Sequence, residues 1–252
     1  MLAPRWFKLR LGSYLRREPD KRRYDRLFRS DSYKRGPAKM ATLLRARAID
    51  ETTPPSLDPN KILVVRFSGL ADYFAPFIGR AGLVSAELRR ITRPNLVPKP
   101  AEAAFIAVHV RLGDFPRSWR QPLDWYRDVV LRTRADLGRR LRVRVYSDGR
   151  ADELQPLLSL PGMEFVQGRT AITDLLDVSQ ASAIVASSST FSMWGTFLGE
   201  VPTIWYPGRM WQTATHDPAI QIEWDGDVPL PSPFVSAVAR KLASDQPRPA
   251  DA

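Results

Sequence analysis

The chain has 252 residues, enough for one large domain or two small ones. Its 44% hydrophobic and 26% charged residues are typical of globular proteins and exclude wholesale disorder. It contains no cysteine and two histidines, which excludes disulfides, a thiol nucleophile and a histidine-rich metal site. No apolar run approaches the ~20 residues that span a bilayer, and the basic amino-terminal segment lacks the apolar core of a secretory signal. We therefore expect a cytoplasmic protein.

The net charge of +11 is concentrated in residues 1–50, which hold 15 Lys and Arg against 5 Asp and Glu. The remainder of the chain is close to neutral. Several aromatic residues lie among the basic ones, and we expect this segment to form a basic helical arm. A solvated arm, attachment to an anionic membrane surface and nucleic-acid binding all fit such a composition, which does not separate them.

Beyond a turn-rich linker at 53–60, the chain alternates between short apolar runs and segments of helical periodicity. This alternation predicts an α/β fold, with a parallel sheet covered by helices on both faces. Prolines at 94, 98 and 100 are expected to end a helix before the second strand. The expected strands are 61–67, 104–110, 141–147, 164–168, 182–187 and 201–207, and the expected helices are 122–139, 150–159, 172–180 and 190–199.

Polar residues directly after an apolar run are candidate site residues, because parallel sheets bind ligands at the carboxyl ends of their strands. The first such segment is HVRLGDF at 109–115. Alternation places His109 and Arg111 on one face of the strand. An arginine at a strand end, where the chain turns at Gly113, suits a phosphate group. The alternative is an ordinary ion pair between Arg111 and Asp114.

Four consecutive hydroxyl residues, Ser187–Thr190, follow another apolar run, and we refer to them as the serine turn. The apolar spacing from Phe191 to Leu198 predicts that a helix begins here with its apolar face inward. Helix capping explains one hydroxyl. Four of them favour an anion site at the helix N-terminus, where N–H groups and a partial positive charge are available.

Three further acidic features have alternative interpretations. Asp174 lies near the start of the predicted helix 172–180, where the helix dipole favours a carboxylate, but it could instead accept from the N–H edge of guanine. Asp148 follows the strand 141–147 and is interpreted as a cap for the next helix. The triplet Asp225–Asp227 resembles a metal-binding DxD sequence, yet its position after the last strand favours a surface turn, so we expect no metal site.

Taken together, these segments resemble the α-1,2-fucosyltransferases and the related nodulation and core α-1,6-fucosyltransferases. HVRLGDF resembles their HxRRGD-type segment, and residues 174–199 resemble the segment in which an aspartate and a serine precede an N-S-S-F-S-W-W-type turn. VRVYSDG at 143–149 is similar to the family's strand that ends in Ser-Asp-Asp. SGLADYF at 68–74 lies at about the right distance before HVR to match the family's segment around G-Y-W-Q-x-x-x-Y-F. Pro207 and Trp211 fit the final proline–tryptophan element. The resemblance covers roughly residues 60–225.

This resemblance implies a GT-B-like fold with a Rossmann-type nucleotide-binding half. It also implies transfer of fucose from GDP-fucose, as donor substrate, with inversion of the anomeric centre and no metal or other cofactor. Arg111 matches the pyrophosphate arginine, His109 a neighbour of the nucleotide, and Asp174 the guanine-reading aspartate. The residues expected to close on the phosphates are Ser188, Ser189 and Thr190.

A carboxylate should act as the base that deprotonates the acceptor hydroxyl. Asp114 is the first candidate and Asp72 the second. Three features depart from the family pattern. Leu112 stands where the family has the second arginine of its RR pair, and Ser188 stands where it has the first asparagine before Ser-Phe. The amino-terminal G-G-L-G-N-Q element is absent, together with much of the Rossmann half that contains it.

These features divide the chain into four expected regions. They are a basic helical arm at 1–50, a reduced acceptor-side region at 51–103, a nucleotide-sugar-binding Rossmann-like domain at 104–230, and a carboxy-terminal helix with a disordered tail at 231–252.

The expected activity is transfer of fucose to a saccharide acceptor, carried on a membrane lipid in bacterial surface-polysaccharide assembly. The basic arm would hold the enzyme at the inner face of the cell membrane. The alternative is a non-catalytic or degraded transferase that acts as a basic binding module or as the partner subunit of a complete enzyme. Nucleic acid is the less favoured partner, because the acidic residue and serine turn typical of the family are retained.

Overall fold

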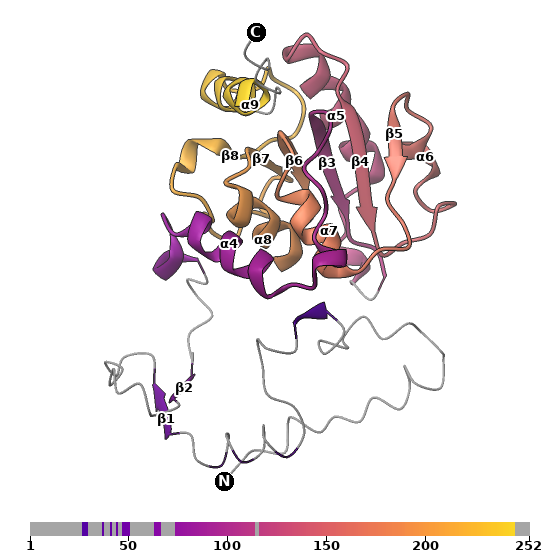
Figure 1. The fold of residues 1–252 in the computed structure, drawn as a ribbon. Helices are drawn as coiled ribbons and strands as arrows, with labels where there is room; N and C mark the ends of the chain where they lie inside the picture. The colour runs from indigo at the N-terminus through magenta and orange to yellow at the C-terminus, as the bar shows by residue number, and fades with distance from the viewer. Residues whose placement is uncertain are drawn as a thin grey trace, which may run out of the picture.

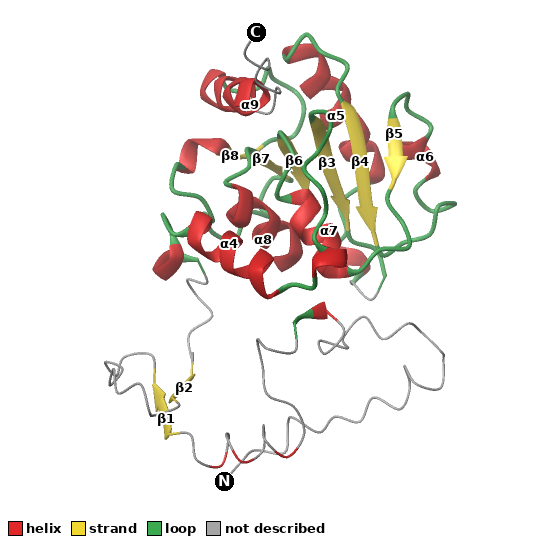
Figure 2. Cartoon of the chain, viewed as in Figure 1, coloured by secondary structure: helices red, strands yellow, loops and turns green. Residues whose placement is uncertain are grey.

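A six-stranded, fully parallel sheet forms the centre of the computed structural model (Figures 1 and 2). The structure describes residues 27–29, 47–50, 63–66, 74–113 and 116–244, with the single residues 37, 41 and 44. The strands lie in the order β5-β4-β3-β6-β7-β8. Their bounds are β3 (Phe105–Val110), β4 (Arg142–Ser147), β5 (Met163–Phe165), β6 (Ala183–Ala186), β7 (Thr203–Trp205) and β8 (Gln221–Glu223).

This strand order is that of a doubly wound Rossmann sheet, in which the chain builds outward from one central strand and then returns to build on its other side. The prediction of an α/β fold with a Rossmann-type parallel sheet is therefore confirmed. The helices that accompany the sheet are α4 (Ala81–Ile91), α5 (Leu123–Asp136), α6 (Gln155–Leu158), α7 (Ala171–Val178), α8 (Thr190–Gly199) and α9 (Ser232–Ser244).

Alternate residues of the strands pack against helices on opposite faces of the sheet. On one face, Ile106 and Val108 of β3 pack with residues of α5, α6 and α9 in a single buried cluster. On the other face, Phe105 and Ala107 belong to a cluster with residues of α4, α7 and α8 (Figure 1). Because both faces are covered, the central strands are buried along their whole length, as near-continuous apolar runs predict.

Two observed strands, β1 and β8, were not predicted, and one predicted strand does not belong to the main sheet. The run 61–67 forms β2 (Leu63–Arg66), which pairs in parallel with β1 (Arg47–Asp50) in a separate two-stranded sheet rather than in the main one. Its apolar composition identifies a strand but carries no information about its partner. The sequences of β1 and β8, RAID and QIE, are short and partly charged, so they lack the pattern that marks a strand.

The division of the chain into four regions stays a prediction, and elements from different expected regions contact one another. β1 lies within the expected helical arm but pairs with β2 of the expected acceptor-side region. α4, also in that region, packs on α8, with Phe74 and Ala81 buried in the shared core. A helix is present at 232–244, as expected, while the tail beyond it lies outside the described residues.

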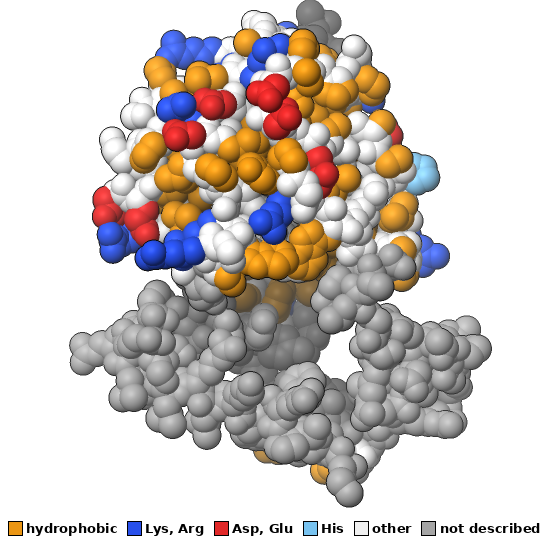
Figure 3. Space-filling model, turned by 180° about the vertical axis from the view of Figure 1, so that it is seen from behind, with side chains coloured by type: hydrophobic (Ala, Val, Ile, Leu, Met, Phe, Trp, Pro, Cys, Tyr) orange, Lys and Arg blue, Asp and Glu red, His pale blue; other side chains and the backbone are white. Residues whose placement is uncertain are grey.

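The rear face of the described part shows no dominance of one charge (Figure 3). Seen from behind, hydrophobic, basic and acidic side chains are interspersed over the body (Figure 3). This mixture fits the near balance of charges that the sequence has outside residues 1–50. Over the part of the chain that the structure describes, no helix is both long and apolar enough to cross a lipid bilayer.

Two glycines allow α8 to pack closely against its neighbours. A Cβ at Gly195 would lie 2.6 Å from a methyl carbon of Val178 in α7. A Cβ at Gly199 would overlap the backbone oxygen of Ser179 and lie 2.7 Å from a methyl carbon of Val201. Since backbone cannot move aside as a flexible side chain can, Gly199 fixes how near the end of α8 approaches the end of α7.

Gly199→Ala should lower the free energy of unfolding by about 1–3 kcal/mol, because the added methyl group overpacks a rigid contact. Gly82→Ala is the matched control: Gly82 lies in α4, and nothing lies within 4 Å of the Cβ it would gain. That substitution should leave stability unchanged or raise it by up to about 1 kcal/mol. Urea unfolding measures both, and equal effects of the two substitutions would contradict the packing role of Gly199.

Candidate functional site

The two polar segments predicted to form a site lie at the switch point of the sheet. β3 and β6 are neighbours, paired from Ile106 opposite Ala183 to Val108 opposite Val185. From β3 the chain continues outward to β4 and β5, whereas from β6 it continues in the opposite direction to β7 and β8. Connections therefore diverge at the carboxyl ends of β3 and β6, which is where doubly wound sheets form a ligand-binding crevice.

Arg111 follows β3 and is held by Asp148, which follows the neighbouring strand β4. Its Nη1 lies 2.5 Å from Asp148 Oδ2, and Asp148 Oδ1 accepts a hydrogen bond of 2.8 Å from the backbone N–H of Leu112. The interpretation of Asp148 as a helix cap is wrong, because α6 starts at Gln155 with Leu154 in the N-cap position. The Arg111 side chain is 33% exposed, so the guanidinium is fixed by an ion pair yet open to solvent.

The chain between these groups is tightly packed. A Cβ at Gly113 would overlap the Asp148 carboxylate, so glycine is needed for this approach. Leu112, which replaces the second arginine of the family pattern, is 8% exposed and belongs to the core cluster on the α5 face. A charged side chain at this position would have to enter the core. Asp114 and Asp72, the two candidate bases, lie outside the described residues.

His109 connects β3 directly to the serine turn. Its Nδ1 lies 2.8 Å from Ser192 Oγ, 2.9 Å from Ser187 Oγ and 3.3 Å from Ser189 Oγ. The Phe191 ring covers the imidazole at a centroid distance of 4.6 Å. Burial lowers the pKa of His109 to about 4, Arg111 lowers it as well, and Asp148 opposes both. The imidazole is therefore neutral at pH 7 and joins the two strand ends through hydrogen bonds rather than charge.

The hydroxyls of the serine turn face different directions. Ser187 and Ser188 are buried, and Ser188 Oγ accepts a hydrogen bond of 2.7 Å from Gln121 Nε2. Ser189 caps α8, where its Oγ accepts from the N–H of Ser192 at 3.4 Å. Thr190, the first residue of α8, is exposed. The prediction of a helix that begins at this turn is thus confirmed.

Two residues of this site were missed in the sequence. Gln121 is buried, donates to Ser188 and to the backbone oxygen of Trp119, and accepts from the Tyr126 hydroxyl at 3.1 Å. It lies in a loop with no apolar pattern, so nothing in the sequence marks it. Ser192 contacts His109 from the buried side of α8. The apolar spacing placed the inward face at 191, 194, 195 and 198, so nothing in the sequence marked Ser192, and Trp194 of that predicted face is exposed instead.

Asp174 lies in the first turn of α7, as predicted, but in a network of its own. Its Oδ1 is 3.2 Å from Arg169 Nε, and Arg169 Nη1 also contacts Asp177 Oδ2 at 2.9 Å. Asp177 is 2% exposed and pairs with Arg144 of β4. α7, which carries Asp174, follows β5. In the sheet, β4 and β3 lie between β5 and β6, the strand that leads into the serine turn.

The DxD-like triplet forms a surface turn, as expected. Asp225 Oδ1 accepts from the Asp227 N–H at 3.1 Å, both aspartates are exposed, and Gly226 adopts a φ of 104°, which favours glycine. Within the described part of the chain, no group of three potential ligands could hold a metal ion.

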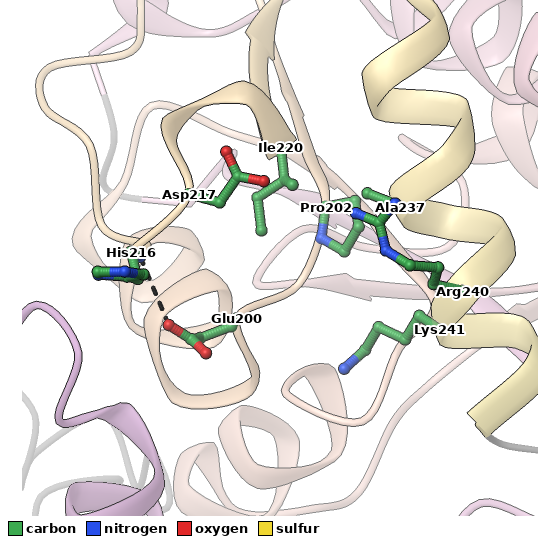
Figure 4. A pocket seen from close by; sticks show the side chains of 8 residues that line it. All are labelled: Glu200, Pro202, His216, Asp217, Ile220, Ala237, Arg240 and Lys241. Atoms are coloured by element: carbon green, nitrogen blue, oxygen red, sulfur yellow. Dashed lines mark hydrogen bonds between the residues drawn. The ribbon is translucent and has the colours of Figure 1, made fainter.

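A pocket of about 430 Å³ lies at the opposite edge of the sheet (Figure 4). Glu200 follows α8, Pro202 precedes β7, and His216 donates its N–H to Glu200 Oε1 at 3.4 Å. Pro202 and Ile220 directly precede β7 and β8, so the pocket lies at the amino ends of these strands. Arg111 and the serine turn follow strands and therefore lie at the carboxyl edge. The pocket is therefore separate from the candidate site. Its lining residues are Glu200, Pro202, His216, Asp217, Ile220, Ala237, Arg240 and Lys241.

Comparison with known proteins gives one distant likeness among solved structures. No protein-family model matches the chain, and no curated protein sequence matches it. The structure of E. coli heptosyltransferase WaaC with ADP is similar over 60% of this chain and 46% of that chain, at 14% sequence identity and a TM-score of 0.38. The chain thus spans less than half the length of that protein. The Rossmann-type fold is shown by the strand order of the chain's own sheet.

The buried His109 should make the protein less stable as the pH falls. The unfolded chain binds a proton near pH 6.5, whereas the folded protein binds it only near pH 4, so acid favours unfolding. His109 should account for a loss of about 2 kcal/mol in unfolding free energy between pH 7 and pH 5. Urea unfolding at both values should show a smaller loss for His109→Gln. An equal loss in both proteins would contradict the burial of a neutral imidazole.

Proposed function

We propose that the chain is a glycosyltransferase that uses a nucleotide-diphosphate sugar. The observation that carries this proposal is that Arg111 and the N-terminus of α8 follow two adjacent strands, β3 and β6, at the switch point of a Rossmann sheet. Helix N-termini present N–H groups with a partial positive charge, and a guanidinium presents paired donors. Together they match the two phosphates of a nucleotide diphosphate.

In such a reaction, an acceptor hydroxyl attacks the anomeric carbon of the sugar in a single displacement. The bond between that carbon and the β-phosphate oxygen breaks, and the nucleoside diphosphate leaves with the bonding electrons. Negative charge therefore develops on the β-phosphate. Arg111 and the turn at 188–190 would stabilise it, and such preorganised donors are often the largest single contribution to catalysis.

The finer proposal is GDP-fucose as the donor. It is supported by the motifs that resemble the fucosyltransferases, among them HVRLGDF and the segment from Asp174 to the serine turn. Asp174 is the proposed reader of the guanine N–H edge, and its carboxylate would exchange part of its pairing with Arg169 for the base. His109 takes a positioning role, since it holds the serine turn against β3.

The acceptor is proposed to be a saccharide, and the base that deprotonates it a carboxylate beside the leaving group. Asp114 remains the first candidate, because it follows Gly113 directly and Gly113 lies against the pair formed by Arg111 and Asp148. The proposed transfer requires no metal, since the guanidinium and the helix N-terminus supply the positive charge that the leaving diphosphate needs. Attachment to an anionic membrane through residues 1–50 is part of the same proposal.

A thermal-shift panel tests the donor. GDP-fucose, GDP-mannose, ADP-, UDP- and CDP-linked sugars should be compared at equal concentrations, since a ligand that binds only the folded state raises the melting temperature. We expect GDP and GDP-fucose to give the largest shifts. A larger shift with another base would contradict the donor assignment, and no shift with any nucleotide would contradict the proposed function. Binding without turnover would favour the non-catalytic alternative.

Arg111→Ala should weaken GDP binding by about 1.5–3 kcal/mol, the usual scale for a hydrogen bond to a charged group. Arg127→Ala is the matched control, because Arg127 is a partly exposed arginine of α5 that pairs locally with Asp124 and Asp128. The control should leave GDP affinity unchanged. Isothermal titration calorimetry measures both, and unchanged affinity in Arg111→Ala would refute the role of this arginine.

A further inference from the structure

Two tryptophans stand exposed on loops at the carboxyl edge of the sheet. Trp119 ends η5 (Arg117–Trp119), in the connection after β3, and Trp211 lies in the loop after β7. Their side chains are 39% and 62% exposed. Exposed apolar side chains that adjoin one another mark interaction sites more often than single ones do. The rings meet edge to face, with centroids 5.8 Å apart and planes inclined at 65°. We refer to Trp119 and Trp211 as the tryptophan platform.

The platform is held in place by its own loops. The Arg209 guanidinium lies 4.9 Å from the centre of the Trp119 ring and donates to the backbone oxygen of Ser118 at 3.2 Å. The backbone N–H of Met210 donates to Glu223 of β8 at 2.7 Å, which fixes the loop just before Trp211. A surface arranged in this way loses little freedom when a ligand binds, so it is suited to recognition.

A direct hydrogen-bonded path joins the platform to the candidate site. Gln121 Nε2 donates both to the backbone oxygen of Trp119, at 3.0 Å, and to Ser188 Oγ, at 2.7 Å. Gln121 is buried, so the loop of Trp119 and the serine turn are positioned relative to each other by one rigid side chain. The platform therefore adjoins the proposed diphosphate site on the β7 side of the sheet.

We propose that the tryptophan platform binds a pyranose ring of the acceptor saccharide, stacked through its C–H face on Trp211. This inference rests on the proposed function. Rossmann sheets place the ribose of a bound nucleotide toward the second strand of the fold, which is β4 here, so the nucleoside lies away from β7. The β7 side is left for the sugar end of the donor and for the acceptor. An indole face matches the apolar face of a pyranose, and the nearby Arg209 carries donors suited to hydroxyl oxygens.

Saturation-transfer NMR with two neutral saccharides, maltotriose and chitotriose, tests the proposal in the full chain saturated with GDP. At least one should receive saturation at its ring C–H protons from the wild-type protein. Trp211→Ala should weaken that binding about three- to tenfold, while GDP affinity measured by calorimetry stays unchanged. Trp194→Ala is the control, because Trp194 lies on α8, is 37% exposed and packs against Phe74 instead. It should bind the saccharide as the wild type does.

The outcomes separate this inference from the function on which it rests. If GDP binds but neither saccharide does, or if Trp211→Ala binds the saccharide as tightly as the wild type, the platform proposal is overturned and the nucleotide site stands. If Trp211→Ala loses GDP, the platform holds the base and the saccharide assignment is wrong. If the saccharide binds through Trp211 but no nucleotide binds, the platform is supported while sugar transfer fails.

Discussion

The ion pair between Arg111 and Asp148 fixes the geometry on which the candidate site depends. Asp148 contacts both the guanidinium of Arg111 and the backbone N–H of Leu112, so one carboxylate joins the ends of two adjacent strands. A flexible arginine loses side-chain entropy when it binds an anion, and a guanidinium already held by a neighbour loses less. The same pairing requires Gly113, since a side chain there would occupy the position of the carboxylate.

The second half of the site is attached to the first by a neutral histidine. A charged imidazole between β3 and β6 would carry a large desolvation cost, whereas a neutral one can bridge hydroxyls inside the protein. His109 is buried, and the shift of its pKa to about 4 keeps it uncharged at neutral pH. The exposed rim of the site carries Arg111, paired with Asp148, and the N-terminus of α8, where the proposed anionic ligand would bind.

The sequence predicted the main sheet well because its signals are local. Apolar runs bounded by turns located β3 to β7 to within a few residues, and the four hydroxyls located the start of α8. Pairing is not local: nothing in KILVVRF shows that β2 joins β1 in a separate sheet. The short edge strand β8 lacks a run long enough to detect.

The same distinction separates the predicted from the missed site residues. His109, Arg111 and the serine turn follow strands, so their position along the chain already placed them at the carboxyl edge. What the sequence did not show are the pairings: Gln121 reaches the serine turn from an irregular loop, and Asp148, although it also follows a strand, pairs with Arg111 across 37 positions of sequence. Side-chain hydrogen bonds of this kind depend on the packed fold, and no periodicity encodes them.

A crystal structure of the protein in complex with GDP tests the central claim most directly. The account predicts the β-phosphate within hydrogen-bonding distance of the Arg111 guanidinium and at the N-terminus of α8. GDP bound instead in the pocket of Glu200 and Lys241, at the amino edge of the sheet, would contradict it.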